Sequence, residues 1–315
     1  MQLAEPGAGE VRVRMEACGI CHSDVMITGL EKLPLAPLVL GHEGIGVVEA
    51  VGDGVSSVAA GDRVGITYLA SSCGACEQCR SGRERFCLKQ KNHGYTRHGV
   101  LATYAVVAAQ NLVRVPAKLS ATEAAPLSCA GWTAMGALRE SGVQSGQWVA
   151  IFGFGGLGHL AMHYAHHIGA KVAVVDVGEE KLAFAKSLGA DIAVAPEQVR
   201  QTLGKELGGV EASLVFTASA AAVPPAFSAL KRCGSLILVG LTTDTYSFSV
   251  TETVLKGVRI QGSYLGTRGD LERVFALAAD GIAKSTVTEY PLEATPELIT
   301  KLHQGQLTGR AVVKF

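Results

Sequence analysis

A glycine-rich turn between a strand-forming and a helix-forming segment constrains the fold of this chain more than any other feature. The apolar run WVAIF, residues 148–152, leads directly into GFGGLG, and the helix-forming segment HLAMHYAHHIG follows. Such a turn lets the backbone approach a pyrophosphate closely and points the N-terminus of the next helix at its negative charge. A ligand-free strand-to-helix turn is the alternative. The flanking elements favour dinucleotide binding, with contacts from Gly153, Gly155, Gly156 and Gly158.

An acidic residue ends the next strand-forming run. Asp176 closes VAVVD, 23 residues after Gly153. Its carboxylate can accept hydrogen bonds from the ribose diol of an adenosine but would repel a 2′-phosphate, and no arginine follows directly to neutralise one. The sequence therefore favours NAD over NADP.

The character of the sequence changes near residue 125. Before it, short strand-forming runs such as VRVRM and GVVEAVG are broken by glycine, proline and aspartate, which is typical of a turn-rich β domain. After an alanine-rich helical stretch, residues 122–138, continuous apolar strands alternate with helices, which predicts a parallel sheet covered on both faces. We expect a β-rich catalytic domain at 1–125, completed by 267–315, and a dinucleotide-binding domain at 126–266.

Composition and charge exclude several classes of protein. Of the 315 residues, 48% are hydrophobic and 18% are charged, which excludes a disordered chain. The 28 Lys and Arg residues balance the 28 Asp and Glu residues, so nothing electrostatic points to a nucleic acid or an anionic membrane. The sequence has no visible export signal and no apolar run of about 20 residues. We expect a cytoplasmic protein with small-molecule partners, and no nucleic-acid or membrane partner.

Four cysteines lie close together in the polar segment SSCGACEQCRSGRERFC. Thiolates spaced in this way can close a tetrahedron around Zn²⁺ and leave no position open for a substrate. Four reduced thiols or two disulfides are the alternatives. The spacing predicts a structural zinc site formed by Cys73, Cys76, Cys79 and Cys87.

A sparser set of candidate ligands lies nearer the N-terminus. It comprises Cys21 and His22 in GICHSD, and His42 and Glu43 in LGHEGIG. A lone His or Cys beside an apolar strand belongs to the core at least as often as it binds a metal. Spacing alone leaves both interpretations open.

Taken together, these motifs resemble the zinc-dependent alcohol dehydrogenases of the medium-chain dehydrogenase/reductase family, over essentially the whole chain. GHEGIGVVEAVGDGV is similar to the zinc signature of the family, and the four-cysteine loop and GFGGLGH follow in the same order. The resemblance implies a catalytic zinc held by three ligands: Cys21, His42 and Cys129. It also implies that Glu43 lies near the metal, that Asp24 orients His42, and that Ser23 takes the proton from the bound alcohol.

The resemblance also implies contacts to NAD beyond the glycine turn and Asp176. These are, for the pyrophosphate, His22 and Arg310; for the nicotinamide, Thr133 and Leu157; and, for a ribose, Lys181. Tyr68 and Leu69 fall where the family lines its substrate pocket.

Some features depart from the family or lie outside its motifs. Met26 stands where relatives commonly have a histidine that hands the proton to solvent, so we expect Ser23 to use a ribose hydroxyl and water instead. Relatives usually carry further residues before PGAGEVRVRM, and a chain that starts here is expected to expose unpaired backbone near residues 11–15. We expect Cys18 and Cys233 to be buried free thiols.

The resemblance implies a Rossmann-type doubly wound parallel sheet domain plus a β-rich, GroES-like catalytic domain. The implied function is that of an NAD-dependent enzyme with two Zn²⁺ ions per chain, one catalytic and one structural, that interconverts a primary alcohol and its aldehyde. A polyol or cinnamyl-type dehydrogenase is an alternative, and so is a truncated paralogue that binds zinc and nucleotide without catalysis. A homodimer or homotetramer is expected, formed through the edge strand VRIQGSY.

Overall fold

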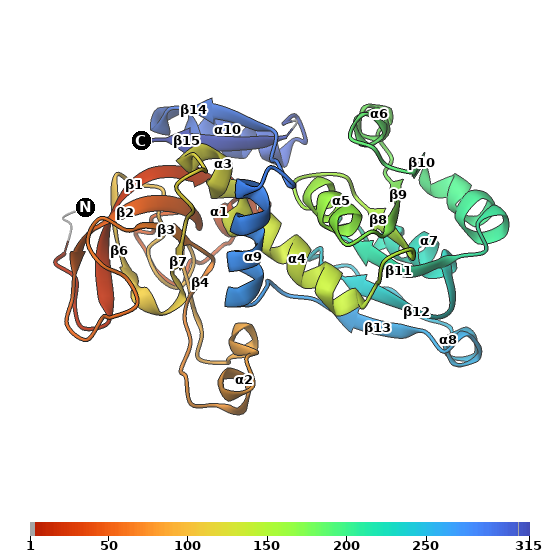
Figure 1. The fold of residues 1–315 in the computed structure, drawn as a ribbon, viewed down its shortest axis with the longest axis horizontal. Coiled ribbons are helices and arrows are strands. Elements are labelled where there is room, and N and C mark those ends of the chain that lie inside the picture. Colours follow the sequence, from red (N-terminus) through yellow and green to blue (C-terminus); the bar gives the residue numbers. More distant parts are fainter. Residues whose placement is uncertain (1–3, 308) are drawn as a thin grey trace. The chain divides into compact units, whose positions relative to one another are not determined.

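The computed structural model describes residues 4–307 and 309–315, and the chain divides into two compact units (Figure 1). The first unit combines Met1–Trp132 with Gly266–Phe315, and the second is Thr133–Leu265. The first boundary falls inside helix α4 (Ala130–Ser141), after the predicted position 125, and the second falls one residue before the predicted 266.

The first unit is built on a mostly antiparallel sheet in the order β14-β15-β1-β2-β3-β7, with β6 also paired to β1. A separate two-stranded sheet joins β4 and β5. The strands are β1 (Glu10–Gly19), β2 (Glu43–Val51), β3 (Arg63–Ile66), β4 (Leu69–Ser71), β5 (Lys91–Asn92), β6 (Tyr104–Ala108), β7 (Val113–Arg114), β14 (Val287–Tyr290) and β15 (Arg310–Lys314). Alternating side chains of β1, such as Val11, Val13 and Met15, fill the core of the sheet.

The expectation of unpaired backbone near residues 11–15 is wrong. Strand β1 pairs with β2 along one edge, and its residues Glu10 to Arg14 pair with Ala108 to Tyr104 of β6 along the other. Both edges of this segment are therefore satisfied by strands that follow it in the sequence, which local patterns could not reveal.

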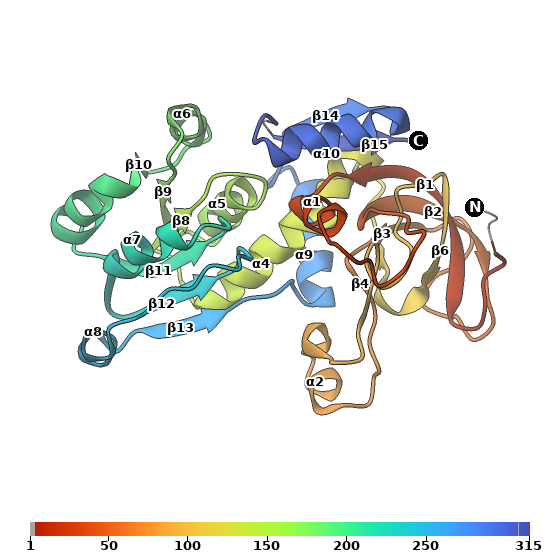
Figure 2. The ribbon, with the colours of Figure 1, turned by 180° about the vertical axis from the view of Figure 1, so that it is seen from behind.

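Five α-helices lie within the described residues of the first unit. They are α1 (His22–Thr28), α2 (Glu77–Arg80), α3 (Ala121–Ala124), α9 (Arg268–Ala279) and α10 (Thr295–His303). The view from behind shows the short helix α1, which follows β1, beside α10 (Figure 2). Thr267 caps α9 by accepting a hydrogen bond from the backbone N–H of Asp270, and the Asp270 carboxylate accepts one from the backbone of Thr267.

The second unit contains a parallel sheet in the order β10-β9-β8-β11-β12-β13. Its strands are β8 (Trp148–Phe152), β9 (Lys171–Val175), β10 (Ile192–Val194), β11 (Val210–Val215), β12 (Leu230–Leu238) and β13 (Arg259–Gly262). Helices α5 (Gly158–His167), α6 (Glu179–Ser187), α7 (Val223–Ser228) and α8 (Val250–Lys256) connect them, together with a π-helical segment, Arg200–Glu206. Because strand order reverses between β8 and β11, their C-terminal ends form the position where such sheets bind ligands.

The helix expected over 122–138 is interrupted. Helix α3 gives way to a 3₁₀ turn, Ala125–Ser128, and α4 begins only at Ala130. Pro126 lies at the start of the 3₁₀ turn, where its missing N–H is tolerated. The break leaves Cys129 outside both helices, with φ −129° and ψ −65°.

No helix in the described part of the chain is both long enough and apolar enough to cross a lipid bilayer.

Candidate functional site

Four buried side chains from distant parts of the chain converge in the first unit. Cys21, His42, Glu43 and Cys129 each offer one potential ligand atom, and these atoms lie within 4.8 Å of one another. The Sγ atoms of Cys21 and Cys129 are 4.0 Å apart although 108 positions separate the residues. Two thiols and an imidazole form a ligand set that a catalytic Zn²⁺ takes, with a position left for substrate.

Each of these residues lies where a helix or a strand begins. Cys21 directly precedes α1, His42 directly precedes β2, and Cys129 occupies the break before α4. Gly41, which leads into His42, has φ +89°, and a Cβ there would lie 2.9 Å from the Sγ of Cys18. A residue with a side chain would be strained at this position, so glycine is required for the chain to enter the site.

The buried carboxylate of Asp24 holds the two segments that carry Cys21 and His42. Its Oδ2 accepts a hydrogen bond from the backbone of Cys21 at 2.9 Å, and its Oδ1 accepts one from Gly41 at 3.3 Å. The same Oδ1 lies 3.3 Å from Nδ1 of His42. A carboxylate at Nδ1 fixes the imidazole so that Nε2 is the atom available to a metal.

The unsatisfied polar atoms of the cluster fit a metal ion. His42 is fully buried, and neither of its ring nitrogens makes a hydrogen bond of good geometry among the described residues, although Nδ1 lies 3.3 Å from Oδ1 of Asp24. A buried, unpaired polar atom costs roughly 1–3 kcal/mol, so an arrangement that leaves Nε2 facing two thiols needs an additional binding partner. A zinc ion would supply that partner.

The two thiols of the cluster are joined by a hydrogen bond. A hydrogen bond from Cys129 lowers the pKa of Cys21 well below its usual value, against the effect of burial. The same contact raises the pKa of Cys129 well above its usual value, because a second buried thiolate would meet the charge of the first. A divalent cation removes this conflict, since it favours both thiolates together.

Glu43 forms a buried ion pair with Arg310. Both carboxylate oxygens accept hydrogen bonds from one guanidinium nitrogen, and 267 positions separate the two residues. Burial raises the pKa of Glu43 to about 7, and Arg310 opposes this shift. The predicted contact of Arg310 with a pyrophosphate stays a prediction; in this structure the side chain also reaches the carbonyl of Ile20 at 3.3 Å.

The residues of helix α1 lie around the cluster in different environments. Ser23 is half-buried, with its Oγ 3.8 Å from the Sγ of Cys21. His22 is exposed, and Met26 is 47% exposed. A thioether carries no exchangeable proton, so Met26 cannot act as a proton relay.

Of the two residues expected in the substrate pocket, Tyr68 lies against a candidate ligand. Its ring contacts that of His42 edge to face, with centroids 5.2 Å apart and an angle of 81° between the planes. Leu69 is only 2% exposed and belongs to β4.

The four cysteines of the polar loop also come together. Cys73, Cys76, Cys79 and Cys87 form the second group whose ligand atoms lie within 4.8 Å of one another. The Sγ of Cys79 lies 3.9 Å from that of Cys73 and 3.5 Å from that of Cys76. The backbone N–H groups of Cys76 and Lys89 point at sulfur atoms of the group, which is typical of thiolate ligands. The geometry fits the structural zinc site predicted from the spacing.

The glycine turn has the strand-to-helix geometry that the sequence predicts. Gly153, directly after β8, has φ +96°, and a Cβ at Gly158 would lie 2.2 Å from the carbonyl oxygen of Gly153. By contrast, a Cβ at Gly155 would meet no protein atom within 4 Å. Leu157 precedes the first residue of α5. Thr133, a buried residue, lies in the first turn of α4.

Asp176 directly follows β9 and fixes the turn. Its Oδ2 accepts a hydrogen bond from the backbone of Phe154 at 2.7 Å, and its Oδ1 accepts one from Gly178 at 3.1 Å. Lys181 lies 3.7 Å from Oδ1. The carboxylate is 7% exposed and is held beside the start of α6.

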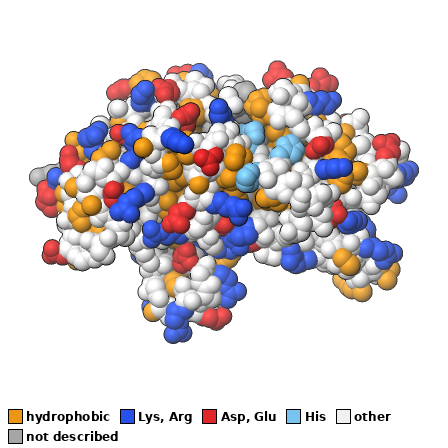
Figure 3. Space-filling view, in the orientation of Figure 1, with side chains coloured by type: hydrophobic (Ala, Val, Ile, Leu, Met, Phe, Trp, Pro, Cys, Tyr) orange, Lys and Arg blue, Asp and Glu red, His pale blue; other side chains and the backbone are white. Residues whose placement is uncertain are grey.

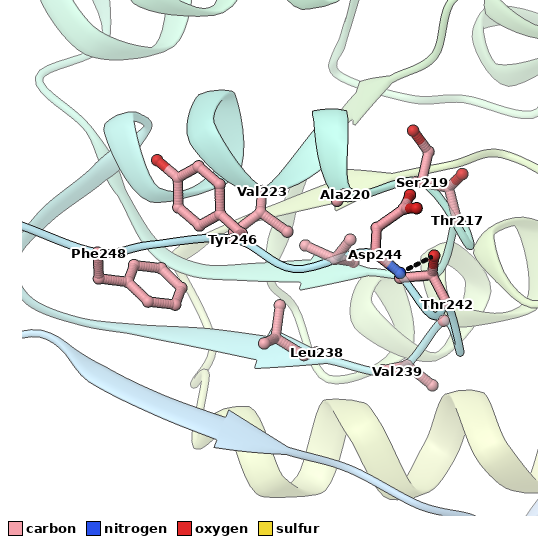
Figure 4. A pocket seen from close by; sticks show the side chains of 12 residues that line it. Thr217, Ser219, Ala220, Val223, Leu238, Val239, Thr242, Asp244, Tyr246 and Phe248 are labelled. Carbon is pink, nitrogen blue, oxygen red and sulfur yellow. Dashed lines mark hydrogen bonds between the residues drawn. The ribbon is translucent and has the colours of Figure 1, made fainter.

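A small pocket of ≈ 160 Å³ lies at the C-terminal ends of β11 and β12 (Figure 4). Thr217, Ser219 and Asp244 gather at one end of it, and Tyr246 and Phe248 lie at the other. The sequence patterns did not single out these residues. Thr217 could have been found, because it ends the apolar run SLVFT, where parallel sheets place ligand contacts.

Comparison with known proteins places the chain in a family. Residues 7–117 match the model described as an alcohol dehydrogenase GroES-like domain, and residues 156–280 match that of a zinc-binding dehydrogenase. An alcohol dehydrogenase of Geobacillus stearothermophilus is 44% identical over 97% of this chain and 92% of that protein. The chain belongs to the zinc-binding alcohol dehydrogenase family.

Solved structures of this family are similar over the whole chain. An alcohol dehydrogenase of Aeropyrum pernix has a TM-score of 0.90 and 32% identity, covering 100% of this chain and 96% of that one. An NAD-dependent alcohol dehydrogenase has a TM-score of 0.89 and 30% identity, covering 100% and 94%. The predicted family, oxidoreductase class and fold class are therefore confirmed. The roles assigned to individual residues in this alcohol dehydrogenase stay predictions.

Proposed function

We propose that this protein oxidises a primary alcohol to its aldehyde with NAD⁺, releasing NADH and a proton, and that it also catalyses the reverse reaction. The observation that carries the proposal is the convergence of Cys21, His42 and Cys129, with an unpartnered Nε2 on His42. Membership of a zinc-binding dehydrogenase family supports the metal, and similarity to an NAD-dependent alcohol dehydrogenase supports the cofactor.

Cys21, His42 and Cys129 would hold a catalytic zinc, with Glu43 beside it. Zinc lowers the pKa of bound water by about nine units, to about 7, and a comparable shift for an alcohol would make loss of its proton possible at neutral pH. This shift of about nine units corresponds to roughly 12 kcal/mol. Arg310 forms an ion pair with Glu43, which offsets part of the cost of burying this carboxylate near the thiols.

The remaining residues of the site position the ligands and move the proton. Asp24 fixes the ring of His42 and the backbone of Cys21. Ser23 takes the proton of the substrate hydroxyl, and its position beside Cys21 supports this role. Because Met26 carries no exchangeable proton, Ser23 would need another route to solvent for this proton, and a ribose hydroxyl of bound NAD together with water would supply one. Tyr68 and Leu69 line the pocket for the alcohol.

NAD would be bound by the glycine turn, by Asp176 and by contacts from His22, Thr133, Leu157, Lys181 and Arg310. The backbone N–H groups at the start of α5 suit a pyrophosphate, and Asp176 suits the adenosine ribose. The four-cysteine group would hold the second, structural zinc. This ion stabilises a polar loop that has little apolar core of its own.

We also propose that the protein forms a homodimer or a homotetramer. Among the described strands, β13 pairs only with β12 and so leaves one edge open. Nearby, α8 exposes Val250, Val254 and Leu255, at 76%, 70% and 65% of their surface. Hydrophobic side chains gather over α8 in the space-filling view (Figure 3).

A cytoplasmic location is proposed as well, supported by eight free cysteines, which suit a reducing compartment.

Replacement of Cys129 tests the proposal. The Cys129→Ser variant should lose turnover of ethanol, benzyl alcohol, sorbitol and cinnamyl alcohol, because one zinc ligand is removed. Metal analysis should find one zinc per chain in place of two, and calorimetry should find NAD binding retained. The exposed Cys233→Ser variant is the matched control and should keep both ions. Unchanged turnover in Cys129→Ser, or loss of both zinc ions, would overturn the assignment of the sites.

A further inference from the structure

His93 is a buried histidine that has no role in the proposed reaction. It is 2% exposed, and its Nδ1 lies 2.7 Å from the carbonyl oxygen of Thr67. A carbonyl can only accept a hydrogen bond, so the proton of the neutral ring must be on Nδ1. Burial lowers the pKa of His93 to about 4, which keeps the ring neutral at physiological pH.

His93 holds the backbone that carries Tyr68. Besides the contact from its ring to Thr67, its backbone N–H donates to the carbonyl of Tyr68 at 2.9 Å. The side-chain amide of Asn111 donates hydrogen bonds to the next two carbonyls, those of Leu69 and Ala70, at 3.1 and 3.3 Å. Four successive carbonyls are therefore fixed by two residues. Tyr68 lies between β3 and β4, and the bonds to the carbonyls of Thr67 and Tyr68 help to hold the backbone from which its ring extends.

The loop that contains His93 also contacts the segment before His42. Gly94 has φ +72°, and a Cβ there would lie 3.0 Å from the backbone nitrogen of Gly41. Gly41 directly precedes His42, whose ring meets the ring of Tyr68. The loop that contains His93 therefore contacts both the backbone that carries Tyr68 and the backbone that leads into His42.

We infer that His93 is a positioning residue for the metal site: its Nδ1–H and backbone N–H hold Tyr68 so that the Tyr68 ring packs against His42. The inference rests on the proposed function, because it takes His42 as a zinc ligand. His93 acts through Tyr68 and does not itself touch the substrate or the metal. Loss of such supporting contacts typically lowers metal affinity or activity by roughly 10- to 100-fold.

Two substitutions separate the hydrogen bond from the bulk of the ring. The amide of His93→Asn can place an N–H near the position of Nδ1 and keep the bond to Thr67, whereas His93→Leu cannot. The catalytic zinc of His93→Leu should be released to a chelator roughly 10-fold faster than in wild type, with a comparable fall in kcat/KM. His93→Asn should recover most of both properties. His303→Leu, which replaces an exposed histidine at the end of α10, is the matched control and should change neither.

A double-mutant cycle tests whether His93 acts through Tyr68. Tyr68→Ala alone should lower zinc retention, and adding His93→Leu to it should cause less than a twofold further loss. Additive losses, or an Asn variant as impaired as the Leu variant, would overturn the inference. ¹⁵N spectra of histidine-labelled wild-type protein provide a readout apart from activity, and they should show the neutral Nδ1–H tautomer from pH 8 down to about 5.5. If the Cys129→Ser variant keeps both zinc ions and its activity, the proposed function itself is wrong. That outcome is distinct from failure of the inference about His93 alone.

Discussion

At the scale of single residues, two buried aspartates perform comparable tasks in the two units. Asp24 accepts hydrogen bonds from the backbones of Cys21 and Gly41, and Asp176 accepts them from Phe154 and Gly178. Each carboxylate joins segments that must meet at a site, and each places a negative charge where the proposed ligand has a complementary group. Hydrogen bonds to charged groups contribute about 1.5–3 kcal/mol, so both carboxylates stabilise the backbone around the proposed sites.

Replacing Asp176 should narrow the preference between the two nicotinamide cofactors. In Asp176→Ala, NAD loses an acceptor for its ribose diol, whereas NADP is freed from a repulsive carboxylate. The ratio of kcat/KM for NAD to that for NADP should fall at least about tenfold, consistent with the loss of one charged hydrogen bond. Steady-state kinetics with both cofactors measures this ratio.

The control for this change is Asp191→Ala. Asp191 also accepts a backbone hydrogen bond, from Val172, but at the start of β9 instead of its end. The Asp191→Ala variant should lower the stability of the protein without changing its preference between NAD and NADP. An unchanged preference in Asp176→Ala would remove Asp176 from its proposed role.

At the scale of elements, the turn between β8 and α5 needs its glycines for two different reasons. Gly158 is required by the protein, because a Cβ there would collide with the carbonyl of Gly153. Gly155 is exposed and has open space around its position, so the folded protein alone does not require it. The proposed reason for Gly155 is the close approach of a pyrophosphate.

Alanine substitutions separate these two reasons. Gly158→Ala should lower the melting temperature by several degrees, since a core backbone contact must shift at a cost of about 1–3 kcal/mol. Gly155→Ala should melt within about a degree of wild type but bind NAD at least about tenfold more weakly by calorimetry. Equal NAD affinity in Gly155→Ala and wild type would show that the dinucleotide does not approach this part of the turn.

At the scale of the whole molecule, the two units meet different requirements. The first supplies both groups of potential zinc ligands, and the second supplies the parallel sheet with its glycine turn. The second unit also carries the features that favour self-association, namely the open edge of β13 and the exposed side chains of α8. A sheet edge left open in this way is a site for pairing with another chain.

Charged substitutions on α8 should disrupt the proposed assembly. Val254→Asp combined with Leu255→Asp should convert the homo-oligomer to a smaller species in light scattering, because burial of two carboxylates in an apolar interface is unfavourable. The folded monomer should tolerate the changes, since exposed positions contribute about 0.5 kcal/mol or less. Leu30→Asp, an exposed leucine of the first unit, should leave the assembly unchanged. A wild-type mass in the double variant would place the interface elsewhere.

Features encoded by neighbouring residues were predictable from the sequence. The four-cysteine group lies within fifteen positions, and the strand, glycine turn and helix around Gly153 are continuous, so short-range spacing already constrained both. Local patterns predicted the burial of a side chain less well where residues distant in the sequence determine its surroundings. We expect Cys233 to be buried, but it is exposed and has φ +63°, because it lies in an irregular stretch of β12 between Leu230 and Ser235, the residues that pair with β11 on either side of it.

The sequence by itself determined the apolar strands, the turn chemistry and the thiol spacing, because side-chain periodicity and loop geometry act over a few residues. The tertiary structure decided which remote residues meet: Cys21 with Cys129, Glu43 with Arg310, and His93 with the backbone of Tyr68. Such pairs depend on how strands are ordered in a sheet and where helices break, which are properties of the packed chain. The resemblance to a known family named Cys129 in advance, but only folding explains how a helix interrupted at Pro126 brings its thiol to the buried cluster.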